Sequence, residues 1–322
     1  MTEEQIKFLL SESNNEVLEA HKEIVSMQRD KSNILVFGDE WLDSNLIGGL
    51  NNKLCFFGSR PSNGKTYHCS QTINNLLNTE LNPTPVSILR FNLEMPTQSL
   101  MLQEISKVLK RDLKDILSRP YSEEEKPVVT DIVNSFMDKR VKNISKVLLA
   151  NDFRQLVLSH IKEVDRKDKE MNDVRWEKHK KENPNLSEKE LTSTFTYIKT
   201  KKIGLIDHLM VYKNKEEIDS ILLVCNELKM LDSNLSFVIY FQFRRDIEDM
   251  WRDSKDKKVN PKNMLPNSTF IYQTDILQQV ADIVVGFVIP QIYDLDEFVA
   301  VHKERNIHLD CLLYTSPSPR DS

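Results

Sequence analysis

The feature that most constrains the fold is a short apolar run that ends in a glycine-containing loop and a Gly-Lys-Thr sequence. Residues 54–57 read LCFF, residues 58–66 read GSRPSNGKT, and a stretch of helical character follows. A strand, a tight loop and a helix in this order gather backbone N–H groups and the N-terminus of a helix around one point, which is the arrangement that binds phosphate. The sequence therefore predicts a nucleotide-binding loop at the end of a buried strand.

The two residues that begin the helix carry the clearest roles in such a loop. We expect Lys65 to reach the β- and γ-phosphates and the Thr66 hydroxyl to ligate Mg²⁺. The strict pattern has glycine where this chain has Ser59, although Gly58 directly precedes it. A plain turn is the alternative interpretation. The remaining residues expected to contact the nucleotide are Ser59, Arg60, Pro61, Ser62, Asn63 and Gly64.

Five further apolar runs are typical of buried strands. They lie near Val86, within residues 201–212, and near Phe237, Val284 and Val299. Continuous apolar runs separated by helical stretches are typical of a parallel sheet buried on both faces, so we expect an α/β fold with a mainly parallel sheet flanked by helices. Asp207 closes one run, and burying its carboxylate is costly unless it meets a cation. This makes Asp207 a candidate ligand for Mg²⁺.

The chain divides into three parts. Residues 1–30 have the apolar spacing of one or two amphipathic helices that dock on a core or on a neighbouring subunit. Residues 31–310 form the main domain, with a charged helical insertion at about 105–202 that contains a flexible or protruding segment. Acids and bases alternate in this insertion, which favours a solvated face over a nucleic-acid site.

The tail at 311–322 reads CLLYTSPSPRDS and resembles the translation of a transposase-type sequencing adapter. The alternative is a disordered Ser/Pro-rich terminus. We exclude the tail from the fold and expect the natural C-terminus to lie beyond this sequence.

Composition limits the classes of partner. The net charge is -5, so DNA binding requires local basic patches, or a ring of subunits that points such patches inward. The four cysteines lack the spacing of metal or disulfide sites, which is typical of a reducing cytoplasm. With no apolar run of membrane-spanning length and an acidic start, we expect a soluble intracellular protein.

The run SRPSNGKT resembles the Walker A loop of DnaB-type replicative helicases, which carry Arg-Pro-Ser and a small first residue. The preceding segment FGDEWLDSNLIGGLNNKL is similar to the one that introduces this loop in the family. The resemblance covers residues 37–306 in islands and implies a RecA-like P-loop NTPase core that uses ATP and Mg²⁺. The matching positions upstream of the loop are Leu42, Asp43, Gly48, Gly49 and Leu50.

The resemblance also implies catalytic roles. Glu94, in FNLEM, corresponds to the carboxylate that polarises the attacking water, although a surface glutamate at a helix start is the alternative. Asp207, in GLIDHLMVY, corresponds to the Walker B aspartate. His208 and Met210 depart from the usual Tyr and Gln, and packing or a substrate-side contact is favoured for His208 over metal binding. Gln242 corresponds to a residue that senses the γ-phosphate.

Two further segments match the family in part. Gln279 and Asp282 are carried over from a segment that has lost its first Glu and an Asp in this chain. Lys303 and Arg305 fit a Lys-x-Arg pair that enters the nucleotide site of the adjacent subunit as an arginine finger. The resemblance therefore implies a homo-oligomer, a hexameric ring in this family.

Single-stranded DNA binding is expected in the loops after the third and fourth predicted strands, because it requires a positive groove along the phosphate backbone. Ordinary polar loops are the alternative. The leading interpretation is a cytoplasmic replicative helicase motor, in a bacterial or phage-infected cell, with a primase or loader as further partner. The alternatives are a RecA-type ATPase of recombination or repair that does not unwind DNA, and a nucleotide-gated scaffold. The candidate DNA-binding residues are Lys213, Lys215, Arg252, Lys255, Lys257, Lys258 and Lys262.

Overall fold

In the computed structural model, the described residues are 34–46, 49–61, 63–212, 214–243, 249, 252, 258, 275–288 and 311–313. The amphipathic segment 1–30, the strand predicted near Val299, and Lys303 and Arg305 lie outside them. The division of the chain at residues 30 and 310 therefore stays a prediction.

A parallel sheet is the centre of the molecule. Its seven strands have the order β3-β2-β4-β5-β1-β6-β7, and every neighbouring pair is parallel. The α/β expectation is confirmed, and so are the five predicted strands that fall in the described residues. The strands are β1 (Leu54–Ser59), β2 (Val86–Asn92), β3 (Val141–Ile144), β4 (Lys201–Asp207), β5 (Leu235–Gln242), β6 (Ile283–Val288) and β7 (Cys311–Leu313).

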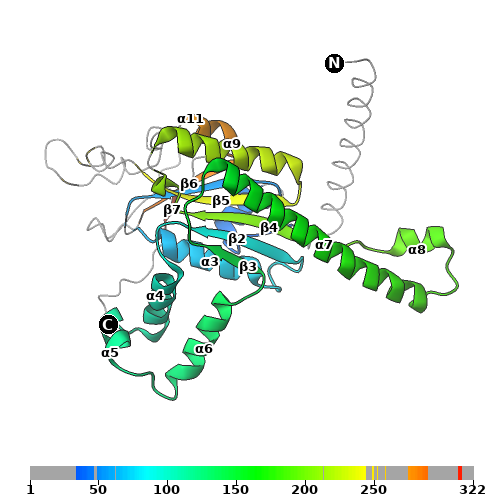
Figure 1. The fold of residues 1–322 in the computed structure, drawn as a ribbon, viewed down its shortest axis with the longest axis horizontal. Helices are drawn as coiled ribbons and strands as arrows, with labels where there is room; N and C mark the ends of the chain where they lie inside the picture. The colour runs from blue at the N-terminus through cyan, green and yellow to red at the C-terminus, as the bar shows by residue number, and fades with distance from the viewer. Residues whose placement is uncertain are drawn as a thin grey trace.

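Helices cover both faces of this sheet (Figure 1). On one face lie α2 (Glu40–Asn45) and α3 (Lys65–Leu77), whose apolar side chains pack with those of β1, β4 and β5. On the other lie α7 (Ala150–Glu182), α9 (Lys215–Leu231) and α11 (Asp275–Val280). The central strands β1, β4 and β5 are buried on both sides, which explains why they read as continuous apolar runs.

Of the positions before the loop that the family resemblance singled out, Leu42 and Asp43 lie on α2, Gly49 and Leu50 follow it, and Gly48 lies outside the described residues. Leu42 and Leu50 are fully buried, and the Asp43 carboxylate accepts hydrogen bonds from the backbone N–H groups of Phe37 at 2.7 Å and Gly38 at 2.9 Å. Gly49 has a φ of +65°, and a Cβ there would lie 2.4 Å from the carbonyl oxygen of Leu35. Only glycine fits this position without strain.

The stretch at 105–202 was expected to be helical. This expectation is wrong for residues 141–144, which form the strand β3. The strand lies at the edge of the sheet, where its four residues are only half-buried. A half-buried edge strand carries no continuous apolar run, so its sequence VKNI contains no strand signal. The rest is helical: α4 (Thr97–Leu109), α5 (Leu113–Ser118) and α6 (Glu125–Phe136) share a small core beside the sheet, and α7 and α8 (Glu188–Thr194) follow.

The second half of α7, with α8, forms an arm that projects past the sheet (Figure 1). Side chains three or four residues apart on α7 form hydrogen bonds with every second residue of the returning segment 194–200. This spacing is expected, because such side chains share one face of a helix while alternate residues share one face of an extended chain. The arm is therefore held by paired polar groups. The pairs are Asp168 with Thr200, Asn172 with Ile198, Arg175 with Thr196, and His179 with Thr194.

Exposed charges on the arm form mixed ion pairs, such as Arg166 with Glu170 and Lys180 with Glu177. This agrees with a solvated face. The exclusion of the tail from the fold is wrong for its first three residues, because β7 pairs with β6 at the edge of the sheet. Among the helices of the described ranges, none is both long and apolar enough to cross a membrane.

Candidate nucleotide site

The predicted phosphate loop joins β1 to α3. β1 ends at Ser59 and α3 begins at Lys65, with Gly64 as its N-cap in the left-handed region at a φ of 78°. Gly64 offers no side chain to cap this helix end. Since the first N–H groups of a helix have no partner within the helix, those of α3 are directed toward the loop. An anion seated there would satisfy them.

Side chains of the loop are anchored on backbone carbonyls. Arg60 Nη1 donates to the Phe243 carbonyl at 3.5 Å, and Lys65 Nζ donates to the Arg60 carbonyl at 3.4 Å. Lys65 is 8% exposed, and Thr66 is half-buried in the first turn of α3. Pro61 is exposed, Asn63 is buried, and Ser62 lies outside the described residues.

Two predicted carboxylates lie at the carboxyl ends of β2 and β4, which pair with each other. Asn92, the last residue of β2, pairs with Asp207, the last residue of β4, and the N–H of Leu93 donates to the Asp207 carbonyl at 2.7 Å. This register places Glu94 just beyond the same edge of the sheet. Asp207 is 2% exposed, whereas half of the Glu94 side chain is exposed.

Electrostatics link the three groups. Burial lowers the pKa of Lys65, while the negative charges of Glu94 and Asp207 act in the opposite direction. Burial raises the pKa of Asp207, and Arg90 and Lys65 oppose this rise while Glu94 adds to it. The structure therefore brings Lys65, Glu94 and Asp207 together at the carboxyl edge of β1, β2 and β4. In parallel α/β sheets, this edge is where ligands bind.

His208 lies beside the carboxylate of Glu94. Its Nδ1 is 3.8 Å from Glu94 Oε2, and burial lowers its pKa to about 4, with Lys65 adding to the effect. The imidazole is therefore neutral near pH 7, and its Nε2 is buried without a hydrogen-bond partner in the described part of the chain. The peptide bond between Asp207 and His208 is cis.

Arg90 is a site residue that the motifs did not reveal. It lies in the middle of β2, is 4% exposed, and places Nη2 3.7 Å from Asp207 Oδ2. The thiol of Cys69, on α3, interacts with both side chains. The available signal was a charged residue inside the apolar run VSILRFN, because a buried guanidinium requires a partner.

Gln242 and Asp282 lie at opposite ends of their strands. Gln242 ends β5, pairs with Ser59 and is half-buried, so it stands beside the start of the loop. Asp282 lies at the amino end of β6, where its Oδ2 accepts from the N–H of Leu54 and from Lys229 Nζ, both at 2.7 Å. These hydrogen bonds of Asp282 connect β6 to β1 and α9, so they stabilise the fold. Gln279 is exposed on α11.

The candidate DNA-binding residues are described only in part. Lys215 is exposed but begins α9, so its prediction as a loop residue is wrong. The helix begins there because the Asn214 side chain caps it, accepting from the N–H of Glu217 at 2.8 Å. Arg252 and Lys258 are exposed. Outside the described residues lie Lys213, Lys255, Lys257 and Lys262.

The donor set suits a magnesium nucleotide. Within the ranges that the structure describes, no group of three His, Cys, Asp or Glu residues forms a protein-only metal site. Mg²⁺ is ordinarily bound through one or two carboxylates, waters and substrate phosphates, which matches Thr66 and Asp207 beside the N-terminus of α3. The buried Asp207 Oδ1, which has no hydrogen-bond partner in the described chain, fits this interpretation.

Comparisons with solved structures match the fold of the chain. No family model and no curated protein matches the sequence. In structure, the chain is similar to a DnaB-like replicative helicase described with its interactions with primase, at a TM-score of 0.51 and 16% identity, over 84% of this chain and 55% of that one. It is also similar to a separately solved ATPase domain, at a TM-score of 0.57 and 15% identity, over 88% of this chain and 86% of that domain.

This chain thus spans 55% of the length of the DnaB-like helicase that it matches. The resemblance indicated by the phosphate-loop motif is confirmed at the level of the fold: the chain has the RecA-like α/β fold of DnaB-type helicase ATPase domains.

Proposed function

We propose that this protein is an ATP-hydrolysing motor of the DnaB type that moves on single-stranded DNA during replication. The observation that carries the proposal is the meeting of Lys65, Glu94 and Asp207 beside the N-terminus of α3. Phosphoryl transfer requires phosphate binding, charge neutralisation and an oriented nucleophile, and these residues supply the three requirements.

Each side chain has a distinct part in the proposed reaction. The amides of residues 59–66 and Lys65 bind the phosphates, and Thr66 and Asp207 hold Mg²⁺, which neutralises phosphate charge when bound. Glu94 orients a water molecule and accepts its proton, and its half-exposed carboxylate is open to solvent. We assign to Gln242, which pairs with Ser59, the role of sensing the terminal phosphate.

The remaining parts of the proposal concern assembly and DNA. Lys303 and Arg305 complete the site of a neighbouring subunit in a hexameric ring, and primase or a loader joins it in the cytoplasm. A ring multiplies a small basic patch, which offsets the net charge of -5. The residues proposed to contact single-stranded DNA are Lys213, Lys215, Lys255, Lys257 and Lys258.

The test combines ATP hydrolysis, subunit mass and strand displacement. We expect hydrolysis that rises with single-stranded DNA, a ring-sized species in the presence of nucleotide, and unwinding of forked DNA. Lys65→Ala should abolish all DNA-dependent hydrolysis, with Lys53→Ala, a lysine before β1, as the matched control. Hydrolysis without unwinding would favour a recombination or repair ATPase, and nucleotide binding without hydrolysis would favour a scaffold.

A further inference from the structure

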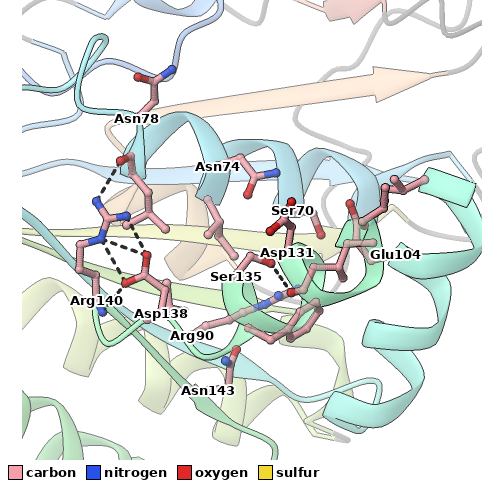
Figure 2. Close-up of a pocket in the computed structure, with 17 residues that line it drawn as sticks. Ser70, Asn74, Asn78, Arg90, Glu104, Asp131, Ser135, Asp138, Arg140 and Asn143 are labelled. Carbon is pink, nitrogen blue, oxygen red and sulfur yellow. Dashed lines mark hydrogen bonds and ion pairs between the residues drawn. The ribbon is translucent and has the colours of Figure 1, made fainter. Parts of the chain in front are cut away.

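Arg90 lines a pocket of about 570 Å³ (Figure 2), and its guanidinium also faces Asp207 of the candidate nucleotide site. The pocket lies between α3, α6 and β2, and its wall includes Ser70, Arg90 and Asp131. Asn74 and Asp131 are exposed, so the pocket opens to solvent. A second arginine of the pocket, Arg140, is already paired with Asp138, whereas Arg90 faces Asp207.

The Arg90–Asp207 pair is a poor source of stability. Charge-assisted N–H···O bonds are about 2.7–2.9 Å long, whereas Arg90 Nη2 lies 3.7 Å from Asp207 Oδ2. Both side chains are at least 95% buried, and Arg90 Nε and Nη2 lack hydrogen-bond partners among the residues described. Burying two charges in such geometry costs more than it returns, so stability alone does not account for the pair.

The two oxygens of Asp207 have different surroundings. Oδ2 faces the Arg90 guanidinium, and the Cys69 thiol interacts with the same carboxylate. Oδ1 is buried without a hydrogen-bond partner in the described chain. Arg90 thus faces one oxygen of the carboxylate and leaves the other without a hydrogen-bond partner in the described chain.

We propose that Arg90 is a positioning residue for Asp207: it fixes the carboxylate so that Oδ1 meets the Mg²⁺ of the nucleotide, and it thereby sets the Mg²⁺ requirement for nucleotide binding. The inference rests on the proposed function, because it assigns the metal to Asp207. Groups that orient the ligands of a metal change its affinity by about 10–100-fold when they are removed.

The experiment measures binding of a fluorescent ATP analogue as Mg²⁺ is titrated, with a second series in EDTA. Arg90→Leu should raise the Mg²⁺ concentration for half-saturation by about tenfold and leave binding in EDTA unchanged. Arg90→Lys should stay within about threefold of wild type, because it keeps the charge that Asp207 faces. The matched control is Arg140→Leu, which removes an arginine from the same pocket without touching Asp207, and should not shift the curve.

Chemical rescue separates orientation from folding. Arg90→Ala opens space beside the pocket, so millimolar guanidinium should return its half-saturation toward the wild-type value. If Arg90→Leu is unstable by thermal melting, Arg90→Met, whose unbranched side chain preserves packing, takes its place. A folded Arg90 variant with the wild-type Mg²⁺ curve would overturn this inference alone. Wild-type protein without Mg²⁺-dependent nucleotide binding would overturn the proposed function as well.

Discussion

Replacing Glu94 with Gln should separate ATP binding from ATP hydrolysis. Gln keeps the size and shape of the side chain but cannot accept a proton from water. Glu94 is half-exposed and contacts His208 at 3.8 Å, so the fold does not depend on its charge. The substitution also removes a negative charge near the phosphates, so ATP affinity should stay constant or increase.

The magnitude follows from the role assigned to the carboxylate. Loss of a general base lowers the rate by about 10²–10⁴-fold, or roughly 3–5 kcal/mol in the barrier. The assay is single-turnover hydrolysis of bound ATP, with nucleotide binding measured in parallel. Glu104→Gln is the control, since Glu104 lies on α4 and pairs with Lys107 at 3.7 Å. A Glu94→Gln variant that hydrolyses ATP at nearly the wild-type rate would refute the assignment.

Three further predictions concern the stability of the fold around the site. Gly49→Ala places a Cβ 2.4 Å from the Leu35 carbonyl oxygen at a φ of +65°. It should therefore destabilise the folded protein by at least the ~1–2 kcal/mol of left-handed strain and lower the Tm by several degrees. An unchanged Tm would contradict the backbone conformation described for Gly49. Asp168→Ala removes the acceptor for Thr200 N at 2.7 Å, so it should destabilise the arm locally by about 1–3 kcal/mol and speed amide exchange at 196–200, with nucleotide binding unaltered. Unchanged exchange would contradict the role of the polar pairs between α7 and segment 194–200. Burial lowers the pKa of His160 from 6.5 to about 4, so between pH 4 and 6.5 the unfolded state binds more protons than the folded state. The free energy of unfolding therefore falls as the pH drops from 6.5 toward 4, by up to roughly 3 kcal/mol. His160→Gln should flatten this part of the Tm-against-pH profile, and a variant with the wild-type slope would contradict the role given to His160.

Most of the sheet could be predicted from the sequence because its strands are buried on both faces. In runs such as LSFVIYFQ, apolar side chains are buried on both faces of the sheet. The loop that follows LCFFGS can adopt few conformations between a strand and a helix. β3 could not be predicted in this way. Its residues are half-buried at the sheet edge, so no apolar pattern distinguishes them from the helical stretch around them.

The site residues could be predicted where a motif assigns a single chemical role to a single side chain. Lys65, Glu94 and Asp207 follow from motif and strand position, since the carboxyl ends of parallel strands share an edge. Arg90 required tertiary structure, because only the neighbouring strand and α3 show that its guanidinium faces Asp207. Asp282 shows the reverse case: a motif position was recognisable, but its hydrogen bonds to Leu54 and Lys229 give it a structural task.

We infer that a triphosphate binds on the loop at 59–66 with its magnesium near Thr66 and Asp207. The most direct measurement is a crystal structure with a non-hydrolysable ATP analogue and Mg²⁺. We predict phosphates on the backbone amides at the start of α3, Lys65 against the terminal phosphates, and the metal on the side of Asp207 Oδ1. A nucleotide bound elsewhere, or a metal remote from Asp207, would contradict this claim.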